Sequence, residues 1–150
     1  MTTELEVPRV HVHFTFTIVD EWPPVRGECV WATVLGDDRY LIDNIPFFAM
    51  DIALNDVVEA KSTDGGELEF VRKVRSGGHS TLRVLAEPDL QSELRGQILA
   101  LGCGIEADGS GVQFAVDVPP ESDLEAVLAL CEGWLAAEIA GYETACLVRR

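Results

Sequence analysis

The sequence is very poor in lysine and in basic residues generally, and this scarcity excludes several functions. Lys61 and Lys73 are its two lysines, and 11 basic residues stand against 26 acidic ones, which gives a formal net charge of −15. So negative a chain repels nucleic acid and anionic membranes, and it attracts a basic protein partner. An acidic proteome in the source organism would give the same composition, so that interpretation stays open.

The sequence also lacks long hydrophobic runs and closely spaced cysteines. Its apolar runs are far shorter than a membrane span, and residues 1–10 lack the basic-then-apolar order of a signal peptide, so we expect a cytoplasmic protein. No two cysteines have the spacing of a zinc or redox motif. Each lies in an apolar stretch, so we expect no cofactor and reduced, buried thiols at Cys29, Cys103, Cys131 and Cys146.

The first half of the sequence predicts consecutive strands and little helix. Residues 9–19 alternate cleanly, with apolar side chains on one face and His11 and His13 on the other, which is typical of a half-buried strand. Further strands are expected between turns rich in glycine and aspartate, at residues 27–35, 37–44, 57–62 and 67–76. The pattern predicts a small β-barrel or a curved meander over residues 1–78.

The second half contains two helical patterns. Pro88 opens the first, which has leucine and isoleucine at helical spacing and Gly102 as its stop. Ser122 is the expected N-cap of the second, because Glu125 follows three residues later in a capping-box pattern. This second helix is expected to continue to about Ala140.

Strands flank and separate these helices, so the order of the second half is β-α-β-β-α-β. The strands are expected at residues 80–87, in a hairpin over 103–120, and at 142–148. This order predicts a ferredoxin-like half over residues 79–150, with both helices on one face of a four-stranded antiparallel sheet. The whole chain is therefore expected to be an α+β protein whose two halves pack as one compact unit.

Four segments of the chain carry a resemblance to a known family. They are ECVWA at 28–32, DNIPFFA at 43–49, NDVV at 55–58 and SGGHSTLR at 76–83. Together they resemble an uncharacterised bacterial family, one of the domains of unknown function. The resemblance brings no activity or catalytic residue with it. By analogy, small families of this kind include immunity or accessory proteins that are encoded beside a partner.

We predict no catalytic set, but Glu28, Asp43 and Arg83 are the candidates if the protein is an enzyme. A carboxyl group beside aromatic residues has a raised pKa and serves as a general acid or base. The competing interpretation is structural: Asp43 and Asn44 are good turn residues before Pro46. A half-buried Glu28 also needs a partner, and Arg83 is the one that we expect.

Aromatic side chains supply the candidate binding surface. Trp22 lies beside two prolines in a loop, where an exposed aromatic residue is suited to a protein contact. We expect Asn44, Phe47 and Phe48 to line the same surface.

The metal-ligating pattern is weak. His11 and His13 lie on one strand face at a spacing that can chelate a metal, but a site would need a third ligand, and His79 is the other histidine. Because the apolar face of that strand is the opposite one, we expect both histidines to face water and predict no metal site. The SGGHS segment lacks the pattern of a phosphate-binding loop and is expected to be a plain connection.

Three functional hypotheses follow. The first is a non-catalytic, acidic binding module of the inhibitor or immunity type, which recognises a basic protein. The second is a small-molecule binder or an enzyme that uses a cleft between the halves, with Glu28, Asp43, Asn44 and Arg83 lining it. The third is a homodimer, because ferredoxin-like sheets often pair.

Overall fold

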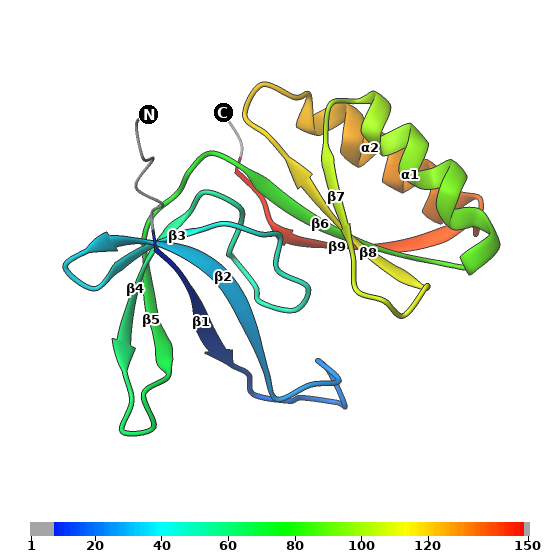
Figure 1. Ribbon diagram of the computed structural model, residues 1–150. Coiled ribbons are helices and arrows are strands. Elements are labelled where there is room, and N and C mark those ends of the chain that lie inside the picture. Colours follow the sequence, from blue (N-terminus) through cyan, green and yellow to red (C-terminus); the bar gives the residue numbers. More distant parts are fainter. Residues whose placement is uncertain (1–7, 149–150) are drawn as a thin grey trace, which may run out of the picture.

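The computed structural model describes residues 8–148, which form nine strands and two α-helices in two sheets (Figure 1). The fold is α+β and mostly β. The first half contains β1 (Arg9–Thr15), β2 (Gly27–Gly36), β3 (Arg39–Ile42), β4 (Val57–Ser62) and β5 (Leu68–Arg75). The second half contains β6 (Ser80–Ala86), α1 (Gln91–Ala100), β7 (Gly104–Ala107), β8 (Gln113–Val118), α2 (Leu124–Ala136) and β9 (Ala140–Cys146), with a 3₁₀ turn at Pro88–Leu90.

The five strands of the first half form a sheet that closes on itself. Neighbouring strands pair antiparallel from β1 to β5, and the ring closes because β1 also pairs with β5, in parallel, through Val12 opposite Leu68. The alternation that predicted β1 is confirmed: Val12 and Phe14 are buried, while His11 is exposed. Inward-facing side chains of the five strands fill the ring and form its core.

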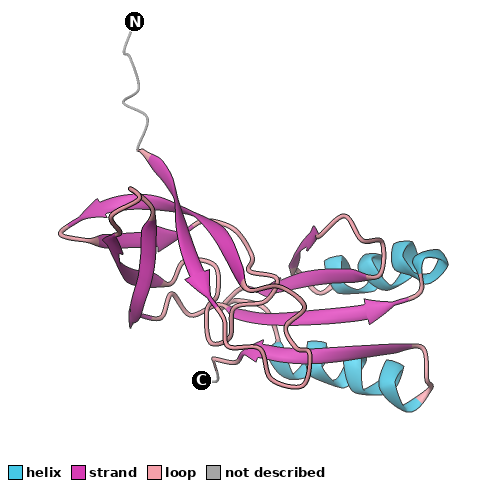
Figure 2. Cartoon of the chain, turned by 90° about the horizontal axis from the view of Figure 1, so that it is seen from below, coloured by secondary structure: helices cyan, strands magenta, loops and turns pink. Residues whose placement is uncertain are grey.

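The second sheet has the strand order β7-β8-β6-β9 and is antiparallel throughout. Both helices lie on one side of it (Figure 1), where Leu82, Val84 and Phe114 pack against Ile98 and Trp134. Figure 2 views the opposite face, which carries no helix and part of which is covered by loops of the first half. That face is polar near the first half, because it carries the buried side chains Thr81, Arg83, Gln113 and Asp117.

The first strand ends earlier than predicted. β1 stops at Thr15, although the main chain of Phe16 still pairs with Arg26. Beyond that point the hairpin passes the end of the sheet, so Ile18 has no layer to pack against and is 43% exposed. The hairpin closes with paired main-chain bonds between Val19 and Trp22 around two residues of positive φ.

The ends of α2 also differ from expectation. Its N-cap is Asp123, whose side chain accepts the N–H of Ala126, and Ser122 instead donates to the carbonyl of Gly102. Competition between adjacent capping residues is not decided by the residue types alone. The helix ends at Ala136 and not near Ala140, because the chain enters β9 at Ala140. Neither helix, of 10 and 13 residues, has the length and apolar character to cross a bilayer within the described chain.

The connection between the two sheets is tightly packed at Gly77. A Cβ atom at this position would lie 2.3 Å from the carbonyl oxygen of Asn55, which is a rigid main-chain group. We expect Gly77→Ala to lower the free energy of unfolding by about 2 kcal/mol or more in urea titrations. The control is Gly133→Ala in α2, where a Cβ meets nothing within 4 Å and should stabilise the helix by about 0.5–1 kcal/mol. Equal effects at the two positions would contradict the close approach.

Candidate functional site

The residues that the sequence singled out meet at a loop between the two sheets. Residues 43–56, here called the inter-sheet segment, connect β3 to β4 and contain no helix or strand. Although irregular, the segment is partly buried: Ile45, Ala49, Ile52 and Ala53 are at most 4% exposed. Its main-chain N–H and C=O groups therefore need partners inside the protein.

Glu28 supplies three of these partners from β2. Its carboxylate accepts the N–H groups of Phe47, Phe48 and Ala49 at 2.6, 3.0 and 2.9 Å. Both carboxylate oxygens are used, one by Phe47 and the other by Phe48 and Ala49. Hydrogen bonds to an ionised acceptor are stronger than those between neutral groups, which suits a carboxylate to this task.

Arg83 holds the same segment from the other side. It comes from β6, is 3% exposed, and donates through Nη1 to the carbonyls of Pro46 and Ala49 and through Nη2 to that of Phe48. Its ionic partner is Glu143 on β9, at 2.6 Å. The expected pairing of Arg83 with Glu28 is therefore wrong. Glu28 accepts from the N–H groups of the loop, and Arg83 donates to its carbonyl groups. The two residues therefore bind complementary groups of the same main chain.

The two turn candidates have structural partners as well. The side chain of Asn44 accepts the main-chain N–H of Trp31 at 2.6 Å, and Asp43 pairs with Arg9 at 2.9 Å. Neither residue lines a pocket together with Arg83. Of the four residues expected to line a cleft, Arg83 lines the pocket described below, and Glu28, Asp43 and Asn44 do not.

The sequence patterns did not indicate two carboxylates that support the same junction, one of them buried and the other half-buried. Asp56 is fully buried and accepts the N–H groups of Ala53 and Gly77, with the Lys73 ammonium 3.2 Å away. Glu106 on β7 accepts the N–H of Ile45 at 3.2 Å. Asp56 follows an asparagine in an ordinary turn pattern, and Glu106 lies in an ordinary strand. The sequence therefore does not distinguish these two carboxylates from the exposed acidic residues.

Burial shifts the titration of the carboxyl groups at this junction. Loss of hydration raises the pKa of Glu106, and the hydrogen bond from Ile45 opposes that rise in part. Burial likewise raises the pKa of Asp117 on β8, although His79 lies 2.8 Å away and opposes it. His79 also contacts the Asn55 amide at 3.2 Å, so it links the inter-sheet segment to the second sheet.

A pocket of about 360 Å³ lies beside this junction, on the helix-free face of the second sheet. Trp22 reaches it from the β1–β2 hairpin, and its ring meets that of Phe48 edge-on at 6.0 Å. Of the predicted residues, Trp22 and Arg83 line the pocket, with Phe48 behind Trp22. The other lining residues are Leu85, Gln113, Gly141, Tyr142 and Glu143.

A second, more open pocket of about 590 Å³ adjoins the first, because Leu85 and Gly141 line both. We call the two together the acidic groove. Exposed apolar side chains form its floor and walls, each between 40% and 49% exposed: Trp22, Leu85, Val112, Leu135 and Ile139. Three glutamates also line it, namely Glu87, Glu138 and Glu143. The one basic lining residue is Arg83, which Glu143 already neutralises.

His11 and His13 lie at another place, on the outer surface of the closed sheet. The ring of His11 contacts that of Trp31 at 3.8 Å between centroids, with the two planes tilted by 44°, and His13 forms a hydrogen bond with Glu69 at 2.8 Å. Across residues 8–148 there is no group of three side chains that could hold a metal ion. Cys29, directly opposite His13, is exposed and not buried as expected. Partial burial and neighbouring carboxylates raise the pKa of its thiol, so it is a poor nucleophile.

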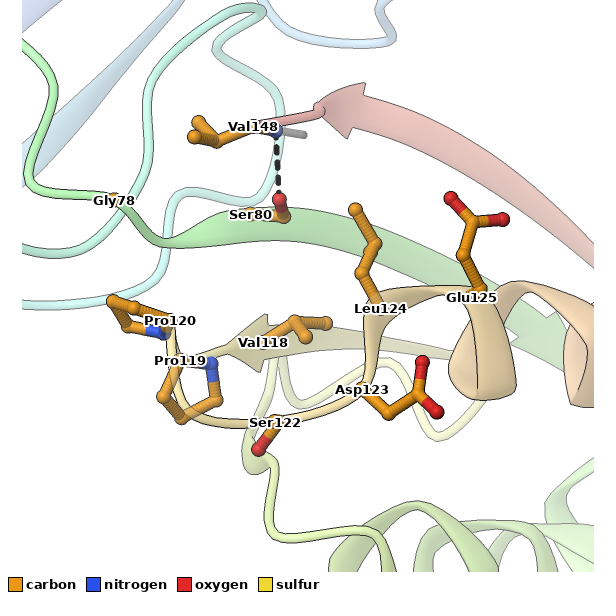
Figure 3. Close-up of a pocket in the computed structure, with 10 residues that line it drawn as sticks. All are labelled: Gly78, Ser80, Val118, Pro119, Pro120, Ser122, Asp123, Leu124, Glu125 and Val148. Atoms are coloured by element: carbon orange, nitrogen blue, oxygen red, sulfur yellow. Dashed lines mark hydrogen bonds between the residues drawn. The ribbon is translucent and has the colours of Figure 1, made fainter. Parts of the chain in front are cut away.

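A smaller pocket of about 230 Å³ lies at the start of α2 (Figure 3). Its hydroxyl and carboxylate groups are used in the fold. Ser80 accepts the N–H of Val148, as drawn in Figure 3, while Ser122 and Asp123 bond the main chain of Gly102 and Ala126. We assign no chemistry to this pocket.

Comparison with known proteins places the chain in a family. The profile of a domain of unknown function, DUF4265, matches residues 28–141. The chain belongs to this family. The match contains every segment that carried the resemblance seen in the sequence, so that prediction is confirmed. Membership in DUF4265 brings no described activity.

One solved structure resembles the whole fold. It is described as a novel crystal structure of a hypothetical protein from Neisseria gonorrhoeae, and it superposes with a TM-score of 0.78 at 22% sequence identity. The alignment covers 99% of this chain and 100% of that one, so the two share both halves of the fold. A search of curated proteins gives no significant match.

The role assigned to Glu28 can be tested by Glu28→Gln. The amide keeps one oxygen but turns an NH₂ group toward a main-chain N–H, so we expect a loss of about 2 kcal/mol in the free energy of unfolding. Hydrogen exchange at Phe47, Phe48 and Ala49 should become faster. The control is Glu93→Gln, at an exposed position in α1, which should change stability by less than about 0.5 kcal/mol. A fully stable Glu28→Gln protein would return Glu28 to the list of catalytic candidates.

The raised pKa of Glu106 predicts a pH dependence. Because its pKa is raised, the Glu106 carboxyl group binds a proton more tightly in the folded state than in the unfolded chain, where a glutamate titrates at about pH 4.3. The contribution of Glu106 is therefore greatest below that pH and is lost as the pH rises through the folded pKa. We expect the stability of Glu106→Gln relative to wild type to increase from pH 4 to pH 7 in urea titrations. Parallel curves for the two proteins would contradict the desolvation of this carboxyl group.

Proposed function

We propose that the protein is a non-catalytic binding module that recognises a basic protein partner through the acidic groove. The observation that carries the proposal is the lining of the groove, where exposed apolar side chains are bordered by Glu87, Glu138 and the Glu143–Arg83 ion pair, so that the lining is acidic overall. Apolar patches rimmed by polar groups are typical of protein contact sites. The rim of carboxylates selects a partner of opposite charge.

The charge of the second half supports this choice of partner. Residues 79–150 contain 12 acidic side chains and 4 basic ones, Arg83, Arg95, Arg149 and Arg150. Arg83 is buried against Glu143, and Arg95 lies over the ring of Phe114 on the helix side of the sheet. Acidic side chains thus outnumber basic ones three to one in this half, which gives it a negative field. Such a field raises the association rate of a basic protein and makes the affinity depend on salt.

The backbone at Glu138 places one of these glutamates at the groove. This residue follows α2 and has a φ of 58°, in the left-handed region where glycine is strongly preferred. A side chain there costs about 1 kcal/mol relative to the same backbone in glycine. Six other non-glycine residues of the described chain also have a positive φ, so this backbone belongs to the turn, and the turn places the Glu138 carboxylate at the groove.

A catalytic function receives less support. Glu28 and Arg83 have their polar atoms engaged by the main chain of the inter-sheet segment. The second candidate is a small-molecule site in the 360 Å³ pocket, since that volume and the indole of Trp22 would suit a small ligand. The third candidate is a homodimer, but two copies that each carry a net charge of −15 repel each other.

The proposal includes a finer description of the fold. We infer that the closed sheet of the first half is a small β-barrel, because strands of one continuous meander close by the β1–β5 pairing. We also infer that the second half is ferredoxin-like. The support is its β-α-β-β-α-β order and the sheet order β7-β8-β6-β9. In that arrangement the helix-free face is the one available to a partner.

The test begins with affinity capture on the full chain, at low salt, from a lysate of the source organism. The recovered partner is then purified, and its affinity is measured by calorimetry at about 50 mM and about 500 mM salt. We expect the double variant Glu87→Lys/Glu138→Lys to weaken binding at least about tenfold. The matched control carries Asp64→Lys and Glu67→Lys, at exposed positions of the β4–β5 turn, and should stay within about twofold.

Glu138→Gly separates function from stability in the same assay. It should raise the free energy of unfolding by up to about 1 kcal/mol and lower the affinity for the partner. If the groove variant and the control variant lose affinity equally, the interaction is a nonspecific charge attraction and not binding at the groove. If no basic partner is retained at low salt, the proposal fails, and thermal-shift screening with metabolites then tests the small-molecule site.

A further inference from the structure

We infer that the partner engages β9 as an extended basic segment that adds one more strand to the second sheet. This inference rests on the proposed function and deepens it, because it specifies which edge of the groove makes the contact and in what conformation. Adding a strand to an exposed sheet edge is an established way for proteins to bind peptides, in which main-chain hydrogen bonds supply affinity and side-chain pockets supply specificity.

β9 is the longer free edge of the second sheet. The order β7-β8-β6-β9 leaves two edges, and β7 has only four residues, whereas β9 has seven. In Figure 2, β9 forms the margin of the sheet and ends beside the C-terminal label. Within residues 8–148 no strand pairs with its outer side.

The edge of β9 lacks most of the features that normally prevent pairing with other chains. Natural edge strands are protected by lysine, proline, short length or bulges. The sequence of β9, AGYETAC, has no lysine and no proline, and its one charged residue, Glu143, is turned to Arg83. The register shift against β6 lies at the end near the first half, between Cys146 and Thr144. Residues 140–144 therefore form a regular, unprotected edge.

The end of β9 nearest the first half already accepts a main-chain donor from outside the sheet. The N–H of Asp51, in the inter-sheet segment, donates to the carbonyl of Ala145 at 2.7 Å. That bond limits the edge available to a partner to the stretch beyond it, residues 140–144. Five residues of strand are enough for the short ladder that such a peptide would form.

The acidic groove lies along this same stretch. Gly141 has no side chain, and a Cβ there would meet nothing within 4 Å, so the surface beside it is open. Apolar residues of an added strand would lie over Leu85 and Trp22 on one face. On the other face they would meet Leu135, since strand side chains alternate between the two faces. A peptide with apolar residues interrupted by basic ones matches this surface.

Carboxylates are present on both faces of the strand. Glu143 lies on the helix-free face with Arg83, and Glu132 on α2 accepts the hydroxyl of Tyr142 at 2.6 Å. That hydrogen bond raises the pKa of Tyr142 to about 12, so the phenol stays protonated and neutral at physiological pH. A second copy of this chain would bring further carboxylates to the same edge. The charge therefore favours a basic strand over self-association.

The test uses three synthetic peptides of eight residues and the full-length protein. The first alternates lysine and valine, the second is identical but N-methylated at every second residue, and the third places the same lysines and valines in two blocks. All three have the same charge, whereas only the first offers both a complete main-chain edge and the alternating pattern. Affinities are measured by calorimetry, and contacts by hydrogen exchange and amide chemical shifts.

We expect the alternating peptide to bind at least about tenfold more tightly than either of the others. Exchange should slow at Gly141, Tyr142 and Glu143, and the fluorescence of Trp22 should change. Gly141→Val, which fills the open surface, should weaken the alternating peptide. Gly104→Val on the opposite edge, where a Cβ would be in ordinary contact with Asp117, should not.

Two failures are distinguishable in this design. If the three peptides bind equally but the groove variants still weaken the natural partner, the inference is wrong and the proposed function stands. If Glu87→Lys/Glu138→Lys leaves the natural partner unaffected, the proposed function is wrong as well. Protection that appears at β7 and not at β9 would overturn the inference directly.

Discussion

The whole arrangement depends on how the inter-sheet segment satisfies its main-chain polar groups. A buried peptide group without a partner costs about 1–3 kcal/mol, and a segment without helix or strand cannot supply enough partners from its own backbone. Side chains from both sheets supply them instead. Glu28 and Glu106 accept N–H groups, Asp56 closes the end of the segment, and Arg83 donates to the carbonyls. One loop is thereby bonded to β2, β6 and β7, which fixes how the two sheets lie against each other.

This use of charged groups has consequences for chemistry and for binding. A carboxylate that accepts three main-chain N–H groups through both oxygens, as in Glu28, is held in place by the fold. The guanidinium of Arg83 is equally committed. Because the segment covers only the end of the second sheet that lies near the first half, the remaining part of the helix-free face stays open. The acidic groove is the result of this partial cover.

Local patterns made much of the fold predictable, and long-range contacts made the site unpredictable. Alternation over residues 9–15 and the order of elements from Ser80 to Cys146 depend on near neighbours, and both agree with the structure. The capping-box pattern predicts the helix cap at Ser122, but the adjacent Asp123 can cap as well, and the contact of Ser122 with Gly102 decides between them. Glu28 and Arg83 were recognised as residues in need of partners. Their partners are main-chain groups, which leave no trace in the side-chain sequence.

The distribution of cations connects stability to binding. Six basic side chains of residues 8–148 form ion pairs, and five of them lie in the first half: Arg9, Arg39, Lys61, Arg72 and Lys73. Exposed pairs contribute little to stability, but they do lower the local charge. The described part of the second half has one ion pair that involves an arginine, between Arg83 and Glu143, and this pair lies at the junction of the two sheets. Negative charge therefore remains where the sheet is open, and nothing in the described chain compensates it there. A partner that supplies the missing positive charge along β9 would relieve this repulsion, which is why the acidic groove and the unprotected edge are best understood as one surface.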